Sequence, residues 1–161
     1  MAYIQSTGDP TFPSMYNVNF PVGKNSPNKR DDVFLVQWML HRVYTDSPSF
    51  TAPDGNDLAM DGWIGPTTIR WITAFQTDVK NKGQSCWVDG RVDRAHAGLT
   101  EVTKTIFTIS YLNSYLAAAN PSVFGAPATD PEIPQELLSA LANNSGADGP
   151  YIEQAIPSGG I

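Results

Sequence analysis

The sequence predicts an all-α fold: a small three-helix bundle with an irregular N-terminal arm and a C-terminal extension that carries a short fourth helix. Two observations support this class. Apolar residues recur at helical spacing in three separate stretches, and Asp-Gly pairs and prolines stand between those stretches. The expected helices cover residues 31–43, 66–80 and 99–119, with the short one at 131–142. The chain then divides into an arm at 1–28, a helical domain at 29–119 and a Pro- and Gly-rich extension at 120–161.

The N-terminal arm combines turn-forming residues with large hydrophobic side chains. The hydrophobic residues are Phe12, Met15, Tyr16, Val18, Phe20 and Val22. A disordered tail rarely carries so many of them. We therefore expect an irregular arm pinned onto the core, compatible with a short strand at Tyr16–Phe20.

The helices at 31–43 and 99–119 each carry a second apolar face beside the core stripe. On the first helix this face holds Phe34 and Trp38, and on the second it holds Phe107, Tyr111 and Tyr115. An isolated three-helix bundle would leave these aromatic side chains in water. Either the extensions of the chain fold back over them, or Phe34, Trp38, Tyr111 and Tyr115 form an interface with a protein partner.

The connection at 45–60 is long, and the stretch that follows it has the densest local signals. Long ordered loops in compact domains often carry function. Asp61-Gly62 predicts a tight turn, and Gly65-Pro66 predicts the start of a helix. After the helix, a second Asp-Gly pair stands at Asp89-Gly90, where we expect Trp87 and Val88 to fill the core.

The stretch at 61–76 resembles the signature of the peptidoglycan-binding domain family (PGBD-like modules), three-helix modules found on cell-wall hydrolases. The family pattern is roughly D-G-x-F-G-P-x-T-x-x-A-V-x-x-F-Q. The residues that match it are Asp61, Gly62, Gly65, Pro66, Thr68, Phe75 and Gln76, with Ile64 and Ile72 as conservative replacements. Residues 32–40 also fit the family's D-V-x-x-L-Q-x-x-L.

A third segment of the resemblance is Val88–Val92, which repeats the Asp-Gly turn. Here Asp93 stands where the family usually has Gly, and the Thr that normally follows is out of register. Altogether the resemblance covers about residues 29–116. It implies a PGBD-like three-helix bundle that binds peptidoglycan through its glycan or its peptide stem.

Composition limits the classes of partner. The formal net charge is −6, so the chain should repel nucleic-acid backbones, and no apolar run approaches the length of a membrane span. A glycan ligand would have to be held by hydrogen bonds and stacking. Residues 1–13 are polar and Pro-rich, without a recognisable signal peptide. We expect synthesis in the cytoplasm and action at the cell wall or periplasm, or in a virion or secretion apparatus.

No arrangement of residues in the sequence predicts catalysis or a cofactor. His41, Cys86 and His96 lack the spacing of metal ligands, and no nucleophile motif is present. Asp61 and Asp89 are interpreted as turn-forming residues before Gly. We therefore expect no metal, no cofactor and no hydrolytic activity.

Four residues are the candidate ligand contacts. Trp63 occupies the variable position of the turn, and an indole can stack on a sugar ring. Arg70 and Arg91 could each bind a peptide-stem carboxylate. Gln37 lies at the edge of the core stripe, where it makes either a buried hydrogen bond or a groove contact.

Two functions remain open from the sequence. The first is a non-catalytic peptidoglycan-binding protein delivered by a bacteriophage particle, a lysis cassette or a secretion system. The second is a structural or adaptor subunit of a phage or contractile secretion assembly, which uses the same scaffold to bind protein. The two extensions should distinguish them, because extensions that cover the core favour the first and extensions that reach outward favour the second.

Overall fold

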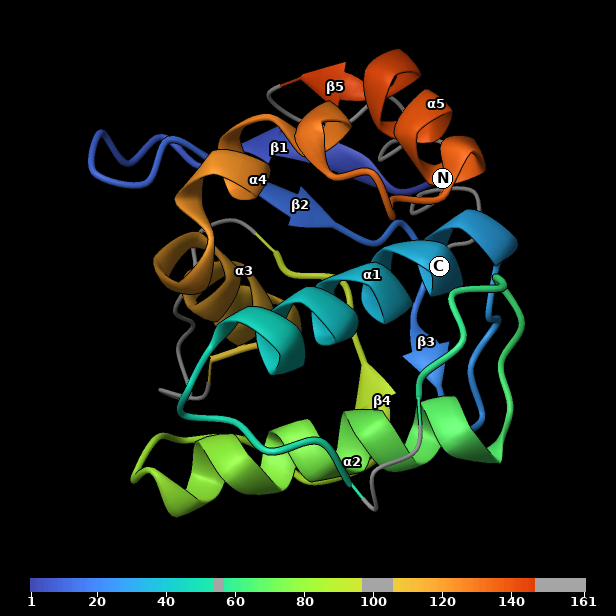
Figure 1. The fold of residues 1–161 in the computed structure, drawn as a ribbon, viewed down its shortest axis with the longest axis vertical. Helices are drawn as coiled ribbons and strands as arrows, with labels where there is room; N and C mark the ends of the chain where they lie inside the picture. Colours follow the sequence, from blue (N-terminus) through green and yellow to red (C-terminus); the bar gives the residue numbers. More distant parts are fainter. Residues whose placement is uncertain (54–56, 97–105, 147–161) are drawn as a thin grey trace.

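The structure is a computed structural model that describes residues 1–53, 57–96 and 106–146. The chain is mainly helical, as predicted, and also has short strands (Figure 1). The helices are α1 (Arg30–Asp46), α2 (Pro66–Asn81), α3 (Thr108–Ala119), α4 (Pro121–Gly125) and α5 (Gln135–Asn143), with a 3-10 turn at Pro127–Thr129. The strands are β1 (Tyr3–Ser6), β2 (Ser14–Asn17), β3 (Val22–Gly23), β4 (Arg91–Val92) and β5 (Ser145–Gly146).

Helix α1 forms the centre of the molecule. Every residue from Asp32 to Leu40 is buried, so this helix has no solvent-facing side over that length. Figure 1 shows why: α2 lies along one side of α1, while β1, β2 and α5 lie along the other. The prediction of a helix over 31–43 is confirmed, and its second apolar face is covered by the chain itself.

Helix α2 begins and ends where the local sequence predicted. Gly65 has an extended backbone at the N-cap position, and Pro66 follows it in the first turn. Proline is tolerated there because N–H groups of the first turn have no acceptor within the helix. At the other end, Gly83 adopts a φ of +86°, which favours glycine. One face of the helix packs into the core, through Trp71, Ile72, Phe75 and Val79.

The C-terminal half differs from the prediction at three places. Helix α3 begins at Thr108, and most of the earlier part of the expected 99–119 helix lies outside the described residues. Asn120 ends α3 and caps α4, a short helix that the sequence analysis missed. The fourth helix begins at Gln135 rather than 131, because Pro134 takes the N-cap position. The end of the extension, from residue 147, lies outside the described residues.

Two small sheets correct the all-α prediction. In one, β1 pairs with β2 in antiparallel fashion and with β5 in parallel, which joins the N-terminal arm to the C-terminal extension. In the other, β3 pairs with β4, so that Val22 lies opposite Val92. The observed strand at Ser14–Asn17 lies slightly before the expected one. The pairings of β1 with β5 and of β3 with β4 could not be predicted from the sequence, because the two strands of each pair are far apart along the chain.

All three predicted segments of the chain contribute to one hydrophobic core. Met15 from the arm, Leu40 from α1 and Leu137 from α5 are each at most 2% exposed. The predicted boundaries at residues 28 and 119 therefore do not divide the hydrophobic core, which contains residues from both sides of each boundary. Among the described helices, none combines the length and the apolar character that a bilayer span requires.

Candidate functional site

The Asp61-Gly62 turn is held by one buried glutamine on α1. The Gln37 amide nitrogen donates to Asp61 Oδ1 at 3.2 Å, to the Trp63 carbonyl at 3.0 Å and to Thr68 Oγ1 at 3.1 Å. Its amide oxygen accepts from the Gly62 backbone N–H at 2.9 Å. Asp61 Oδ1 also accepts from the Trp63 N–H at 3.0 Å, which closes the turn. We call this set of bonds the Gln37 clasp.

The same arrangement occurs a second time, between α2 and α3. The Gln76 amide nitrogen donates to Asp89 Oδ1, to the Arg91 carbonyl and to Thr108 Oγ1, at 3.0, 2.8 and 3.1 Å. Its amide oxygen accepts from the N–H groups of Asp89 and Gly90. We call this set the Gln76 clasp.

The two clasps match position by position, with Asp61-Gly62-Trp63 corresponding to Asp89-Gly90-Arg91. Both glycines have positive φ, +78° and +72°. Thr108 accepts from Gln76 as Thr68 accepts from Gln37. The second Asp-Gly turn lacks a threonine at the spacing that Thr68 has from the first, and Thr108, further along the chain, takes that place. The chain thus contains an internal structural repeat of glutamine, Asp-Gly turn and helix start.

The Gln37 clasp presents Trp63 to solvent. The Trp63 side chain is 67% exposed, although the backbone around it is fixed at both ends by the clasp. A hollow of about 260 Å³ adjoins it. The residues that line this hollow are Asp57, Leu58, Ala59, Asp61, Trp63, Ile64, Gly65, Pro66, Thr67 and Thr68. The site therefore has an aromatic surface beside hydroxyl and carboxylate groups.

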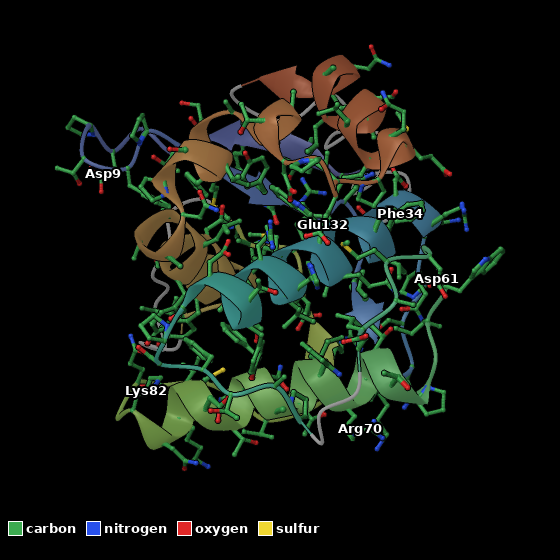
Figure 2. The ribbon with its side chains drawn as sticks, in the orientation of Figure 1. Asp9, Phe34, Asp61, Arg70, Lys82 and Glu132 are labelled. Carbon is green, nitrogen blue, oxygen red and sulfur yellow. The ribbon has the colours of Figure 1, made fainter. Side chains whose placement is uncertain are left out.

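Arg70 lines a second hollow on the same helix. It lies on the outer side of α2 (Figure 2). The groove next to it has a volume of about 390 Å³. The other lining residues are Thr51, Pro53, Thr73, Ala74, Thr77 and Asp78. Thr67, Arg70, Ala74 and Thr77 follow helical spacing, so the two hollows lie along one stripe of α2. The long connection before α2 forms the opposite wall of both.

Two other predicted ligand contacts have structural partners. Gln37 is fully buried with its amide used in the clasp, so it supports Trp63 from behind and does not reach solvent. Arg91 is partly exposed, but its Nε lies 2.8 Å from Asp93 Oδ1. Of the four candidates, Trp63 and Arg70 line the two hollows along α2.

Trp87 is an exposed aromatic residue that the sequence analysis placed wrongly. It was expected to fill the core with Val88, but the two side chains are 73% and 40% exposed. The core position is taken by Cys86, which is 6% exposed. The Gln76 amide oxygen accepts from the Asp89 N–H at 3.0 Å, two residues after Trp87, a contact that no local sequence pattern contains.

The aromatic faces proposed as a partner interface lie within the chain. Trp38 is fully buried, with the Tyr16 ring edge-on at 5.6 Å and its own Nε1 donating to Asp130 Oδ2 at 2.8 Å. Phe34 and Tyr111 are 5% and 4% exposed. The extensions thus cover the face of α1, which confirms the expectation that at least one of them folds back.

Tyr115, the last of the proposed interface residues, is only half-buried. Its ring packs against Phe50 at a centroid distance of 4.9 Å, and its hydroxyl donates to the Gln84 side chain. Phe50 belongs to the connection after α1, so the second aromatic face is covered by a loop rather than by a terminal extension. None of the four aromatic side chains is a freely exposed surface.

Buried carboxylates tie the two extensions to α1. Asp32 accepts from the backbone N–H groups of Asn19 and Phe20 at 2.9 and 3.1 Å, and burial raises the pKa of this carboxyl to about 7. Asp130 accepts from Trp38 and from the Arg42 guanidinium. These groups are structural. In the part of the chain that the structure describes, no three His, Cys, Asp or Glu side chains are grouped so that they could hold a metal ion.

Comparison with protein-family models, with curated proteins and with solved structures finds no match for this chain. The resemblance to peptidoglycan-binding modules therefore rests on the sequence motifs. The structure adds the geometry of the residues in those motifs, above all the two glutamine clasps.

Proposed function

We propose that this chain is a non-catalytic peptidoglycan-binding protein whose ligand contacts the Trp63 side chain and the stripe of α2 that carries Arg70. The observation that carries the proposal is the rigid display of Trp63. The Trp63 side chain is 67% exposed on a turn whose backbone is held by a buried clasp, so the backbone needs no reordering when a ligand stacks on the indole. Binding then costs little ordering entropy.

The chemistry along α2 suits a neutral, hydroxyl-rich polymer with occasional carboxylates. An indole face stacks on the apolar face of a pyranose ring. The threonine hydroxyl groups beside it can exchange hydrogen bonds with sugar hydroxyl or acetamido groups, and Arg70 can bind a peptide-stem carboxylate. From Thr67 to Thr77 the stripe rises by about 15 Å at ~1.5 Å per residue. A ligand that follows it must be extended, as a glycan strand is.

The test is co-sedimentation with purified insoluble peptidoglycan. Wild-type protein should pellet with the wall material, and Trp63→Ala should weaken its affinity by about tenfold, equivalent to ~1.4 kcal/mol. Trp87→Ala is the matched variant, because it removes another exposed tryptophan from the second turn. The suspension should stay turbid throughout, since we propose binding without hydrolysis. Equal affinities of Trp63→Ala and wild type would refute the proposed site.

A second candidate function, an adaptor that binds protein, is favoured only by the exposed pair Trp87 and Val88. The same experiment distinguishes it. A chain that does not pellet with peptidoglycan would favour the adaptor. Delivery by a phage particle, lysis cassette or secretion apparatus stays a prediction from the sequence.

A further inference from the structure

Arg30, the first residue of α1, connects three distant parts of the chain at the proposed site. Its Nε donates to both carboxylate oxygens of Glu136 on α5, at 3.1 and 3.0 Å. Its Nη1 donates to the Asp61 carbonyl at 3.0 Å. The side chain thus links the C-terminal extension to the Asp-Gly turn that carries Trp63.

The Arg30 guanidinium also lies over two aromatic rings. Its central carbon is 4.8 Å from the Phe34 ring centroid and 5.0 Å from the Trp63 ring centroid. Phe34 is only 5% exposed, so its ring gives the guanidinium a fixed support. A planar guanidinium stacks well on aromatic faces. One face of the Trp63 indole is therefore occupied by Arg30.

The backbone of the turn packs closely against this pair. A Cβ at Gly62 would lie 2.8 Å from Phe34 Cε2 and 3.0 Å from Arg30 Cγ, so only glycine allows the approach. Figure 2 shows Phe34 and Asp61 near each other at the end of the molecule where α1 begins. The turn, the two rings and the guanidinium therefore pack together, and Glu136 forms an ion pair with the guanidinium at 3.0 Å.

We infer that Arg30 and Glu136 are positioning residues for the binding site. Arg30 occupies the inner face of Trp63, so a ligand sugar stacks on the outer face only. Glu136 keeps the guanidinium in place, which makes α5 of the C-terminal extension part of the site. This inference rests on the proposed function for its ligand, but the orientation of Trp63 can be measured without any ligand.

The first measurement is acrylamide quenching of tryptophan fluorescence in a Trp87→Phe background, where Trp63 is the exposed tryptophan and Trp38 and Trp71 are buried. Arg30→Ala and Glu136→Ala should both increase quenching, because the inner ring face opens. Arg30→Lys keeps the charge but loses the planar stack, so its quenching should lie between that of the Trp87→Phe parent and that of Arg30→Ala. Asp93→Ala is the matched control, because it breaks an exposed ion pair of similar length that does not touch Trp63.

The second measurement is titration with a β-1,4-linked N-acetylglucosamine tetramer. Arg30→Ala should weaken binding about two- to fivefold, the value of an exposed cation–π contact. The melting temperature of each variant shows whether the fold is intact. Quenching equal to that of the Trp87→Phe parent in both alanine variants would overturn the inference. If the parent instead binds neither the tetramer nor peptidoglycan, the proposed function fails, while the quenching result still decides the positioning role.

Discussion

Replacing Gln37 with alanine should destabilise the whole fold and free the Trp63 turn. The substitution removes four hydrogen bonds at 2.9 to 3.2 Å. Two of the orphaned groups, the Gly62 N–H and the Thr68 hydroxyl, are buried. Each buried polar group left without a partner costs about 1–3 kcal/mol. We therefore expect the free energy of unfolding to fall by about 2–6 kcal/mol in total.

The assay is urea denaturation followed by far-UV circular dichroism, with thermal melting as a second measure. For a chain of this size, each kcal/mol shifts the melting temperature by about 2–4 °C. The expected decrease in melting temperature is thus about 4–24 °C. Gln135→Ala is the control, because that glutamine is exposed at the start of α5. A Gln37→Ala protein that unfolds within ~0.5 kcal/mol of wild type would show that the clasp does not hold the turn.

A charge variant sharpens the same prediction. Gln37→Glu keeps the acceptor for the Gly62 N–H but replaces the donor with a carboxylate, about 3 Å from the Asp61 carboxylate and the Trp63 carbonyl. Like charges at this distance repel, and the variant should be at least as unstable as alanine at neutral pH. Lowering the pH protonates the new carboxyl group and restores a donor. Part of the stability should then return, and no such recovery is expected for Gln37→Ala.

Two further predictions concern the buried carboxylates that hold the extensions. Asp130→Ala should lower the free energy of unfolding by about 3 kcal/mol, measured by urea denaturation. The substitution leaves the buried Trp38 Nε1–H without its acceptor and removes the most buried of the three carboxylates around Arg42, which keeps Asp46 and Glu132. An unchanged midpoint would contradict this. Burial raises the pKa of Asp32 to about 7, above its unfolded value of ~3.9, so the folded chain binds the proton more tightly. The free energy of unfolding should therefore rise as the pH falls from about 7 towards 4, and Asp32→Asn should remove that slope.

The candidate site was predictable in part. Trp63 was identified as a ligand candidate because it stands at the variable position of a recognisable turn, and the structure places it two-thirds exposed, at 67%. Arg30 was missed, since a charged residue at a helix start is ordinarily solvated. Its role depends on Glu136, 106 positions along the chain. No local pattern contains a contact of that separation.

Trp87 is a second residue whose environment the local sequence did not predict. An aromatic residue between Cys86 and Val88 favours burial on hydrophobicity alone, yet the side chain is 73% exposed. The Gln76 clasp holds the backbone of the adjacent turn, and Cys86, 6% exposed, takes the core position beside it. Both facts depend on the folded chain, so hydrophobicity alone could not predict the exposure of Trp87.

Local signals in the sequence were enough to predict helices α1 and α2, because caps, prolines and apolar spacing act within a few residues. The tertiary structure alone decided what covers α1: strands β1 and β2 pair with each other, β1 pairs with β5, and Asp130 binds Trp38. The hydrophobic residues of the arm and of the extension predicted that these segments cover an aromatic face of α1. The strand pairs and the Asp130–Trp38 bond could not be predicted, because they depend on segments that meet only in the folded chain.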